Sequence, residues 1–176
     1  MGKIRIIGGK HRSLQLSVLD SDGLRPTLDR VKETLFNWLG QDLTGLSCLD
    51  LFAGSGSLGF ESISRNAKEV VMIEKDIKVY KQLLQNKNKL KANNCELINQ
   101  DALSFIKNEI KTYDIIFIDP PYNSSLFEQV IPLLDKITTK NSLIYIENSK
   151  DIEYSGFTIL KSAKAGIVKY VLLQKE

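Results

Sequence analysis

An aspartate, two prolines and a tyrosine stand directly after an apolar stretch, in YDIIFIDPPY (residues 113–122). Two consecutive prolines remove two backbone donors and fix two φ angles at the point where a strand stops. A flat base can stack on the ring of Tyr122. Its exocyclic amine can then donate hydrogen bonds to the carboxylate of Asp119 and the carbonyl oxygen of Pro120, which turns the nitrogen lone pair toward an electrophile. We therefore expect Asp119, Pro120, Pro121 and Tyr122 to form a catalytic loop.

A glycine-rich turn lies upstream, in LDLFAGSGSLG (residues 49–59), between a strand-like and a helix-like segment. Glycines let a backbone approach a ligand closely, and the N–H groups that begin the next helix can bind a carboxylate or a phosphate. Glu74 ends the next apolar segment, where a carboxylate can accept both hydroxyls of a ribose. Asp101 follows the third such segment, and we expect it to contact an adenine amino group. These features predict a nucleotide-like cofactor.

The position of Asp50, inside the strand before the glycine turn, favours one class of cofactor. A dinucleotide and S-adenosylmethionine both fit the glycines and Glu74. A carboxylate at position 50 repels a pyrophosphate, but it can orient the turn or meet the ammonium group of a methionine moiety. Together with an amine held by residues 119–122, a sulfonium methyl predicts methyl transfer to an exocyclic amine. Catalysis would then come mainly from positioning the two reactants.

Alternating apolar and amphipathic segments predict how these residues are positioned. From Ser47 onward the alternation indicates an α/β fold with a doubly wound, mainly parallel sheet. Such sheets bind ligands at the carboxyl ends of their strands. Pro132 interrupts the last helical pattern, so that helix should be kinked or start late. The predicted strands are residues 47–52, 69–74, 95–99, 113–119 and 142–148, the predicted helices are 58–65, 77–90, 102–110 and 125–137, and a closing antiparallel pair follows at 157–165 and 167–175.

The first 45 residues carry a different pattern. Two short strand-like stretches surround Gly8 and Gly9, which predicts a hairpin. A helix is predicted from residue 28 to Gly40, with Thr27 as its cap. We expect residues 1–45 to form a hairpin and helix appended to a core of residues 46–176. The predicted apolar face of the helix comprises Leu28, Val31, Leu35, Trp38 and Leu39.

Basic side chains are concentrated near the N terminus. Residues 1–12 hold Lys3, Arg5, Lys10 and Arg12 without any acid, in a chain whose net charge is +3. A basic segment ahead of a globular body is a common footprint of phosphate-backbone binding. Lysines that keep a sheet edge solvated produce the same pattern. Charge alone leaves both interpretations open.

Composition limits the class of protein. The 176 residues are 43% hydrophobic and 26% charged, as expected for one soluble domain. No apolar run approaches the roughly 18 residues that span a bilayer, and the N terminus lacks the apolar core of a signal peptide. Cys48 and Cys95 are expected to be free thiols, which fits a reducing cytoplasm. With His11 they have no zinc-binding spacing, so we expect no metal site, and a monomer is the default.

Several motifs together resemble a known family. LDLFAGSGSLGFE, the acid in VVMIEKD, NQDA and IIFIDPPY are similar to the class I S-adenosylmethionine-dependent amino-methyltransferases, which have a Rossmann-like fold. RIIGGKHRSLQL and LRPTLDRVKETLFNWL are more specific, and they resemble the ribosomal RNA small subunit methyltransferase D family. The resemblance covers nearly the whole chain. It implies methyl transfer from S-adenosylmethionine to the N2 amine of a guanine in 16S ribosomal RNA, in the assembled small subunit or a late assembly intermediate.

By position, the resemblance also assigns roles to individual residues. Those that would hold the cofactor are Asp50, Phe52, Ala53, Gly54, Ser55, Gly56, Glu74, Asp101 and Ala102. Those that would contact RNA are Lys3, Arg5, Lys10, Arg12, Arg25 and Arg30. Arg25 and Arg30 belong, with Thr27, to the RPT-x-DR element of the family, which is expected near the cofactor or the target pocket. The sequence does not specify which guanine is methylated.

Three alternatives account for part of the pattern. A DNA adenine-N6 or cytosine-N4 amino-methyltransferase shares DPPY, but only about 45 residues remain outside the core to recognise a DNA sequence. A looped-out RNA base suits so small an enzyme because it lowers the cost of unstacking. A non-catalytic ribosome assembly factor is expected to have lost the glycine turn or DPPY, and both are intact. An NAD(P)-dependent reductase explains the glycines and Glu74 but leaves DPPY without a task.

Overall fold

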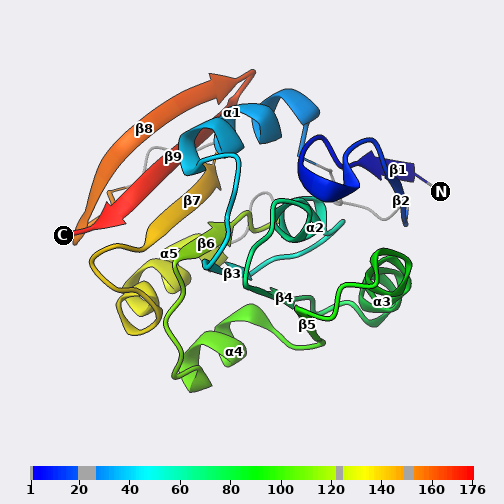
Figure 1. The fold of residues 1–176 in the computed structure, drawn as a ribbon. Coiled ribbons are helices and arrows are strands. Elements are labelled where there is room, and N and C mark those ends of the chain that lie inside the picture. Colours follow the sequence, from blue (N-terminus) through cyan, green and yellow to red (C-terminus); the bar gives the residue numbers. More distant parts are fainter. Residues whose placement is uncertain (1, 20–26, 122–124, 149–152) are drawn as a thin grey trace.

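A seven-stranded sheet forms the centre of the protein in a computed structural model, which describes residues 2–19, 27–121, 125–148 and 153–176. The strand order is β5-β4-β3-β6-β7-β9-β8 (Figure 1). The five strands from β3 to β7 are parallel to one another, which confirms the predicted doubly wound, mainly parallel sheet. The bounds of these five strands are Ser47–Asp50 (β3), Glu69–Ile73 (β4), Cys95–Ile98 (β5), Ile115–Ile118 (β6) and Leu143–Asn148 (β7).

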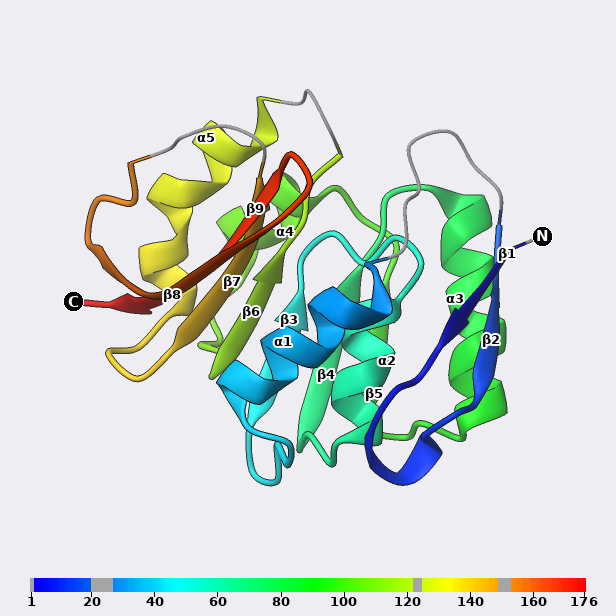
Figure 2. The same ribbon diagram turned by 90° about the horizontal axis from the view of Figure 1, so that it is seen from above.

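Helices cover both faces of this sheet, so its central strands are buried on both sides (Figures 1 and 2). Successive side chains of a strand point to opposite faces. Phe117 and Tyr145 accordingly join the hydrophobic cluster that contains α1, α2, α3 and the N-terminal hairpin, while Ile116 and Ile144 join the cluster under α4 and α5. The helices are Asp29–Leu39 (α1), Ser57–Ser64 (α2), Ile77–Leu90 (α3), Ala102–Asn108 (α4) and Leu126–Val130 (α5).

The C-terminal part of the chain confirms two further predictions. Strands β8 (Phe157–Ala165) and β9 (Val168–Lys175) form an antiparallel pair, and β9 closes the sheet against β7. The segment that contains Pro132 is not one continuous α-helix. After α5 the chain continues as a 3₁₀-helix, η2 (Ile131–Ile137), because the proline can form no backbone N–H hydrogen bond there.

The predicted N-terminal hairpin is present, with a longer connection than expected. Strands β1 (Gly2–Arg5) and β2 (Gln15–Val18) pair antiparallel, and a short 3₁₀-helix, η1 (Gly9–His11), lies between them. Gly9 has φ +73°, and a Cβ atom there would lie 1.9 Å from the carbonyl oxygen of Ser64 in α2. A glycine is therefore required where the connection touches the core.

A buried ionic cluster fixes the hairpin to the core. The carboxylate of Glu61 in α2 accepts hydrogen bonds from the backbone N–H groups of Ile7 and Gly8, at 3.0 and 2.9 Å. It also accepts one from Arg65 Nε at 3.0 Å, and Lys32 Nζ lies 3.7 Å away. Glu61 and Lys32 are 0% and 1% exposed, so their charges compensate each other away from water. The burial of Lys32 was not predicted from the sequence.

Helix α1 begins two residues later than Thr27, which is not its cap. Leu28 occupies the N-cap position without a side-chain cap bond, and its own side chain is 56% exposed. Gly40 ends the helix with φ +99°, as predicted. The buried face consists of Val31, Lys32, Leu35 and Phe36. It is rotated from the predicted face because Lys32 turns inward to meet Glu61.

The proposed boundary between residues 45 and 46 stays a prediction. Side chains of the hairpin and of α1 belong to the same hydrophobic cluster as α2 and the central strands, so the appended segment shares the core. In the described parts of the chain, no helix is both long and apolar enough to cross a membrane.

Candidate active site

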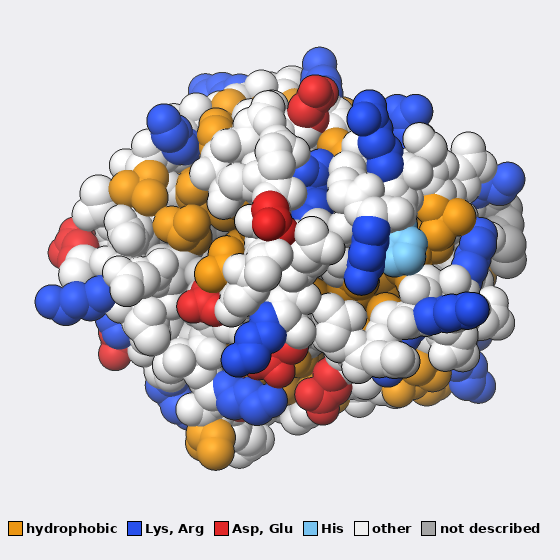
Figure 3. Space-filling view, viewed as in Figure 1, with side chains coloured by type: hydrophobic (Ala, Val, Ile, Leu, Met, Phe, Trp, Pro, Cys, Tyr) orange, Lys and Arg blue, Asp and Glu red, His pale blue; other side chains and the backbone are white. Residues whose placement is uncertain are grey.

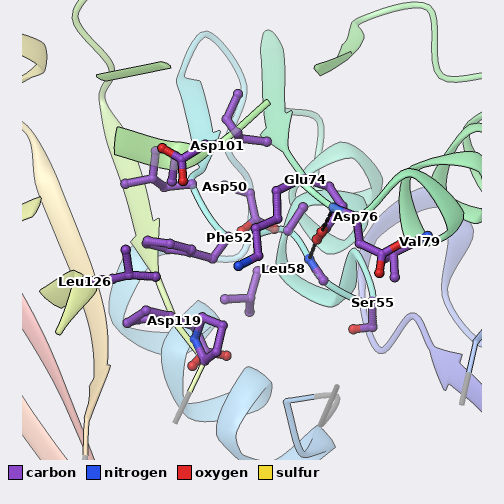
Figure 4. A pocket seen from close by; sticks show the side chains of 18 of the residues that line it. Asp50, Phe52, Ser55, Leu58, Glu74, Asp76, Val79, Asp101, Asp119 and Leu126 are labelled. Atoms are coloured by element: carbon purple, nitrogen blue, oxygen red, sulfur yellow. Dashed lines mark hydrogen bonds between the residues drawn. The ribbon is translucent and has the colours of Figure 1, made fainter. Parts of the chain in front are cut away.

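A cavity of about 250 Å³ opens at the carboxyl ends of β3, β4 and β6 (Figure 4). It lies where the connections from β3 and β6 leave in opposite directions along the sheet, the usual ligand site of a doubly wound sheet. The predicted cofactor residues that line it are Asp50, Phe52, Ala53, Gly54, Ser55, Glu74, Asp101 and Ala102, and three predicted catalytic residues, Asp119, Pro120 and Pro121, line it as well. The structure thus brings together residues from four strand ends.

The glycine turn is held by backbone hydrogen bonds and leads directly into α2. Gly56 has φ +79°, and a Cβ atom on it would lie 2.5 Å from the ring of Phe60. The N–H of Gly56 donates to the carbonyl of Ala53 at 2.7 Å. Gly56 itself is not among the residues that line the cavity. Its role in this structure is to let the turn close tightly against the helix that follows.

The Ser57 hydroxyl is a feature that sequence reasoning missed. Ser57 begins α2 and lines the cavity, and its side chain is 5% exposed. Its Oγ is buried without a hydrogen-bond partner. A buried, unpaired hydroxyl is unfavourable by roughly 1–3 kcal/mol, so this atom is suited to a polar ligand group. The first N–H groups of a helix favour an anion at the same place. The sequence signal that could have identified Ser57 is its place directly after the last glycine of AGSG.

Glu74 and Asp101 are fixed by backbone N–H groups. Glu74 Oε2 accepts from Gly54 N–H at 3.0 Å, and its Oε1 accepts from the N–H of Asp76 at 2.8 Å. Each oxygen keeps a second lone pair, so both remain available to ligand hydroxyls. Asp101 begins α4 and accepts from the N–H of Ser104 at 2.9 Å. Figure 4 shows both carboxylates beside the cavity, with Glu74 on the side of α3.

Asp50 is buried and accepts a backbone hydrogen bond from the end of the glycine-rich segment. Its side chain is 3% exposed, and Oδ2 accepts from the N–H of Gly59 at 3.1 Å. Burial raises the pKa of Asp50 to about 7, although the Gly59 hydrogen bond opposes the shift. Because Asp50 also lines the cavity, a cationic group there would favour its ionised form. The hydrogen bond from Gly59 joins Asp50 to α2, and both roles predicted for Asp50 stay predictions.

Asp119, Pro120 and Pro121 emerge beside the glycine turn. Strand β6 pairs with β3, and Asp119 follows directly after β6. Asp119, Pro120 and Pro121 all line the cavity. Tyr122 lies outside the described residues, so its predicted stacking role stays a prediction.

Asp119 has an acidic neighbour that the sequence reading had not singled out. Burial, then the charge of Glu147 on β7, raises the pKa of Asp119 well above its usual range. Burial also raises the pKa of Glu147, although hydroxyl hydrogen bonds from Tyr145 and Thr27 oppose it. The Tyr145 hydroxyl donates to Glu147 Oε1 at 2.7 Å. The sequence signal that could have identified this neighbour is an acidic residue at the end of the strand next to β6.

The predicted RNA-contacting residues occupy the hairpin and the first turn of α1. The side chains of Lys3, Arg5, Lys10, Arg12 and Arg30 are exposed. Arg5 is already engaged, because its guanidinium donates to Asp29 at 2.7 Å. Lys and Arg side chains gather over the side of the molecule where β1 and β2 lie (Figure 3). Arg25 lies outside the described residues.

Within the described ranges, no group of three or more His, Cys, Asp or Glu side chains could hold a metal ion. Cys48 and Cys95 are free and buried. Burial raises the pKa of both thiols to about 12, so they remain protonated at neutral pH.

Comparison with known proteins gives matches over almost the whole chain. The family model described as Conserved hypothetical protein 95 matches residues 4–174. The ribosomal RNA small subunit methyltransferase D of Haemophilus influenzae is 48% identical, over 98% of this chain and 94% of that protein. The protein of the same name from Escherichia coli K12 is 43% identical, over 99% and 91%.

A solved structure has the same fold. The structure of yhhF from Escherichia coli superimposes with a TM-score of 0.90 at 42% identity, and the match covers 99% of each chain. The agreement includes the N-terminal hairpin as well as the sheet, because both lie within the matched length.

Proposed function

This chain belongs to the ribosomal RNA small subunit methyltransferase D family, and from that premise we propose that it methylates 16S ribosomal RNA with S-adenosylmethionine as the methyl donor. One observation carries the proposal: residues of the glycine turn, Glu74 and residues of the DPPY loop line the same cavity. A cofactor and an amine bound at these two places would meet in one cavity, over the carboxyl ends of β3 and β6.

The residues that would hold the cofactor fit its polar groups. The unpaired Ser57 hydroxyl and the start of α2 suit a carboxylate. Glu74 suits the ribose hydroxyls and Asp101 the adenine amine, while Asp50 suits a nearby positive charge. When bound, S-adenosylmethionine supplies a methyl group on a sulfonium, so the target lone pair forms an N–C bond while the electrons of the broken C–S bond stay on sulfur.

Asp119 and the proline backbone would position the target amine. The carboxylate accepts one amine hydrogen and the Pro120 carbonyl accepts the other, which directs the nitrogen lone pair into the cavity. After the N–C bond forms, the nitrogen is positively charged and loses a proton to Asp119 or to water. Burial, then the charge of Glu147, raises the pKa of Asp119, which makes its ionised carboxylate a stronger base for that proton, and hydrogen bonds donated by the bound amine would favour the ionised form. Positioning supplies most of the rate enhancement in this scheme.

The finer target in our proposal is the N2 amine of a guanine, in the assembled small subunit or a late assembly intermediate. DPPY supports an exocyclic amine, and the exposed Lys10 and Arg12 support contacts with a phosphate backbone. The reaction would take place in the cytoplasm, by a monomer, and the free, unpaired cysteines support a reducing compartment.

The test uses methyl-labelled S-adenosylmethionine with three separate substrates: unmodified small ribosomal subunits, naked 16S RNA and unmethylated DNA. After digestion, the labelled nucleoside is identified. We expect N2-methylguanosine from ribosomal material, and more label from subunits than from naked RNA. Label in DNA adenine or cytosine would preserve the DPPY chemistry but overturn the RNA target. No label in any substrate would overturn the proposed function.

A further inference from the structure

Glu147 lies beside Asp119 because of the register between two parallel strands. Ile118 of β6 is aligned with Ile146 of β7, and both side chains join the cluster under α4 and α5. The next residues, Asp119 and Glu147, therefore point together to the opposite face. This is the face of Tyr145, near the start of α1. Two carboxyl groups thus stand side by side at the carboxyl edge of the sheet.

Two hydroxyl groups hold Glu147 in place. The Tyr145 hydroxyl donates to Glu147 Oε1 at 2.7 Å, and the Thr27 side chain also forms a hydrogen bond with the carboxylate. Thr27 lines the cavity, so Glu147 lies one hydrogen bond behind the cavity wall. A fixed carboxylate at this depth is suited to recognise a ligand group that reaches past Asp119.

Glu147 lies on the side of Asp119 that faces away from the cofactor residues. The strand order places β3, β4 and β5, whose ends carry Asp50, Glu74 and Asp101, on one side of β6. Strand β7 lies on the other side. An amine held by Asp119 therefore belongs to a base whose remaining edge extends toward β7.

The chemistry of the bases distinguishes what a second carboxylate can accept. In guanine, the N2 amine is next to the N1–H, so two donors lie side by side. In adenine and cytosine, the reactive amine is next to a ring nitrogen that is an acceptor. An ionised carboxylate has acceptors only. It would pair with guanine and would be left facing an acceptor in the other two bases, which disfavours them.

We propose that Glu147 is the residue that selects guanine, by accepting the N1–H of the target base while Asp119 accepts the N2 amine. This inference rests on the proposed function, because it names the group that recognises the same base. Burial raises the pKa of Glu147, and the hydroxyl hydrogen bonds from Tyr145 and Thr27 oppose this shift. The N1–H of a bound guanine is a further donor to the carboxylate, and it would favour the ionised form that the pairing requires.

The experiment removes the N1–H without removing the amine. Small subunits are reconstituted with 16S RNA that carries either guanine or 2-aminopurine at the methylated position, which is first mapped with the unaltered protein. We measure kcat/KM for both substrates with the unaltered protein, Glu147→Gln and Thr27→Val. Glu96→Gln, an exposed position on β5, is the matched control for loss of a carboxylate. Thermal melting and S-adenosylmethionine binding verify that each variant is folded.

We expect the unaltered protein and Glu96→Gln to prefer guanine by roughly 10²-fold or more, as sites built around a substrate N–H do. In Glu147→Gln the preference should fall at least about 10-fold, because an amide can donate to the N1 of 2-aminopurine. Thr27→Val should give a smaller fall. An unchanged preference in Glu147→Gln overturns the inference.

The failures of the two proposals can be told apart. If Glu147→Gln does not fold, Thr27→Val decides, and an unchanged preference in that variant overturns the inference. If the unaltered protein labels guanine N2 but these variants keep its preference, only the role of Glu147 falls. If the unaltered protein labels no ribosomal guanine, the proposed function falls and the role of Glu147 falls with it.

Discussion

The carboxylates on the two sides of the cavity are held by different partners. On the cofactor side, Glu74 and Asp101 accept hydrogen bonds from backbone N–H groups. On the target side, Glu147 is bound by side-chain hydroxyls and stands beside another acid, Asp119. Backbone donors cannot rotate away, whereas hydroxyls can, and two neighbouring acids can exchange a proton. The cofactor side is therefore suited to binding a fixed shape and the target side to proton transfer.

The largest expected effect comes from the target side. Asp119→Ala should reduce methyl transfer by more than roughly 10³-fold, because both the amine acceptor and the proton acceptor are lost. S-adenosylmethionine binding, measured by calorimetry, should change by less than about 3-fold. Loss of binding in proportion to loss of rate would contradict the division between the two sides. The matched control is Asp135→Ala, because Asp135 is exposed. Asp114→Ala would not serve, because the Asp114 carboxylate accepts a hydrogen bond from the N–H of Ser47.

A change on the cofactor side should weaken cofactor binding much more than it lowers kcat. Glu74→Ala removes the carboxylate that accepts hydrogen bonds from the Gly54 and Asp76 N–H groups and that we propose to bind the ribose. We expect the Kd for S-adenosylmethionine to rise about 10- to 100-fold, with kcat at saturating cofactor reduced much less. Glu74→Gln should lie between. Titration calorimetry and saturation kinetics separate the two constants, and a fall in kcat alone would argue against this assignment.

The hairpin offers a change outside both sides of the cavity. Reversing Lys10 and Arg12 to Glu should weaken RNA binding about 10-fold or more and reduce its dependence on salt concentration. Binding to small subunits is measured by filter retention at several salt concentrations. The control reverses Lys140 and Lys164, which are also exposed. Equal RNA affinity and an equal salt slope in the hairpin variant would show that the hairpin is structural.

The smallest expected effect is on stability. The raised pKa of Glu147 means that its folded form binds a proton more readily than its unfolded form. This stability is present below the unfolded pKa of about 4.3 and is lost as pH rises through the higher folded value. Glu147→Gln has no carboxyl group at this position, so its stability does not fall in this way as the pH rises. Its unfolding free energy, relative to that of the unaltered protein, should therefore increase as the pH rises from 5 to 8.

Urea unfolding at the two pH values measures this change. The groups that face Glu147 are Asp119, Thr27, Tyr145 and Tyr170. The Tyr145 hydroxyl stays protonated in this range, because burial raises its pKa. A difference that is constant with pH, or that decreases as pH rises, would contradict the raised pKa.

Most of the fold could be predicted from the sequence because its signals are local. The periodicity of α3 gave its bounds at Ile77 and Leu90 without error. The alternation of strands and helices predicted the parallel sheet, in which the structure pairs β6 with β3. The start of α1 was predicted wrongly, because Thr27 looks like a cap while its hydroxyl binds Glu147 in another element.

The candidate site was predicted less completely than the fold. The glycine turn, Glu74 and Asp119 could be recognised because each follows an apolar segment directly. Ser57 was missed, since a hydroxyl without a partner can be identified only when its surroundings are known. The burial of Lys32 was not predicted either, because lysines are mostly exposed, and its contact with Glu61 accounts for it.

By itself, the sequence determined the order of the strands and helices, the tight turn before α2 and the rigid acid that follows β6. These depend on backbone preferences and periodicity within a few neighbouring residues. Only the tertiary structure decided that Glu147 stands beside Asp119 and that Glu61 holds the hairpin. Contacts of this kind depend on the register of strands and on the packing of helices that are distant in the chain, and no local pattern records them.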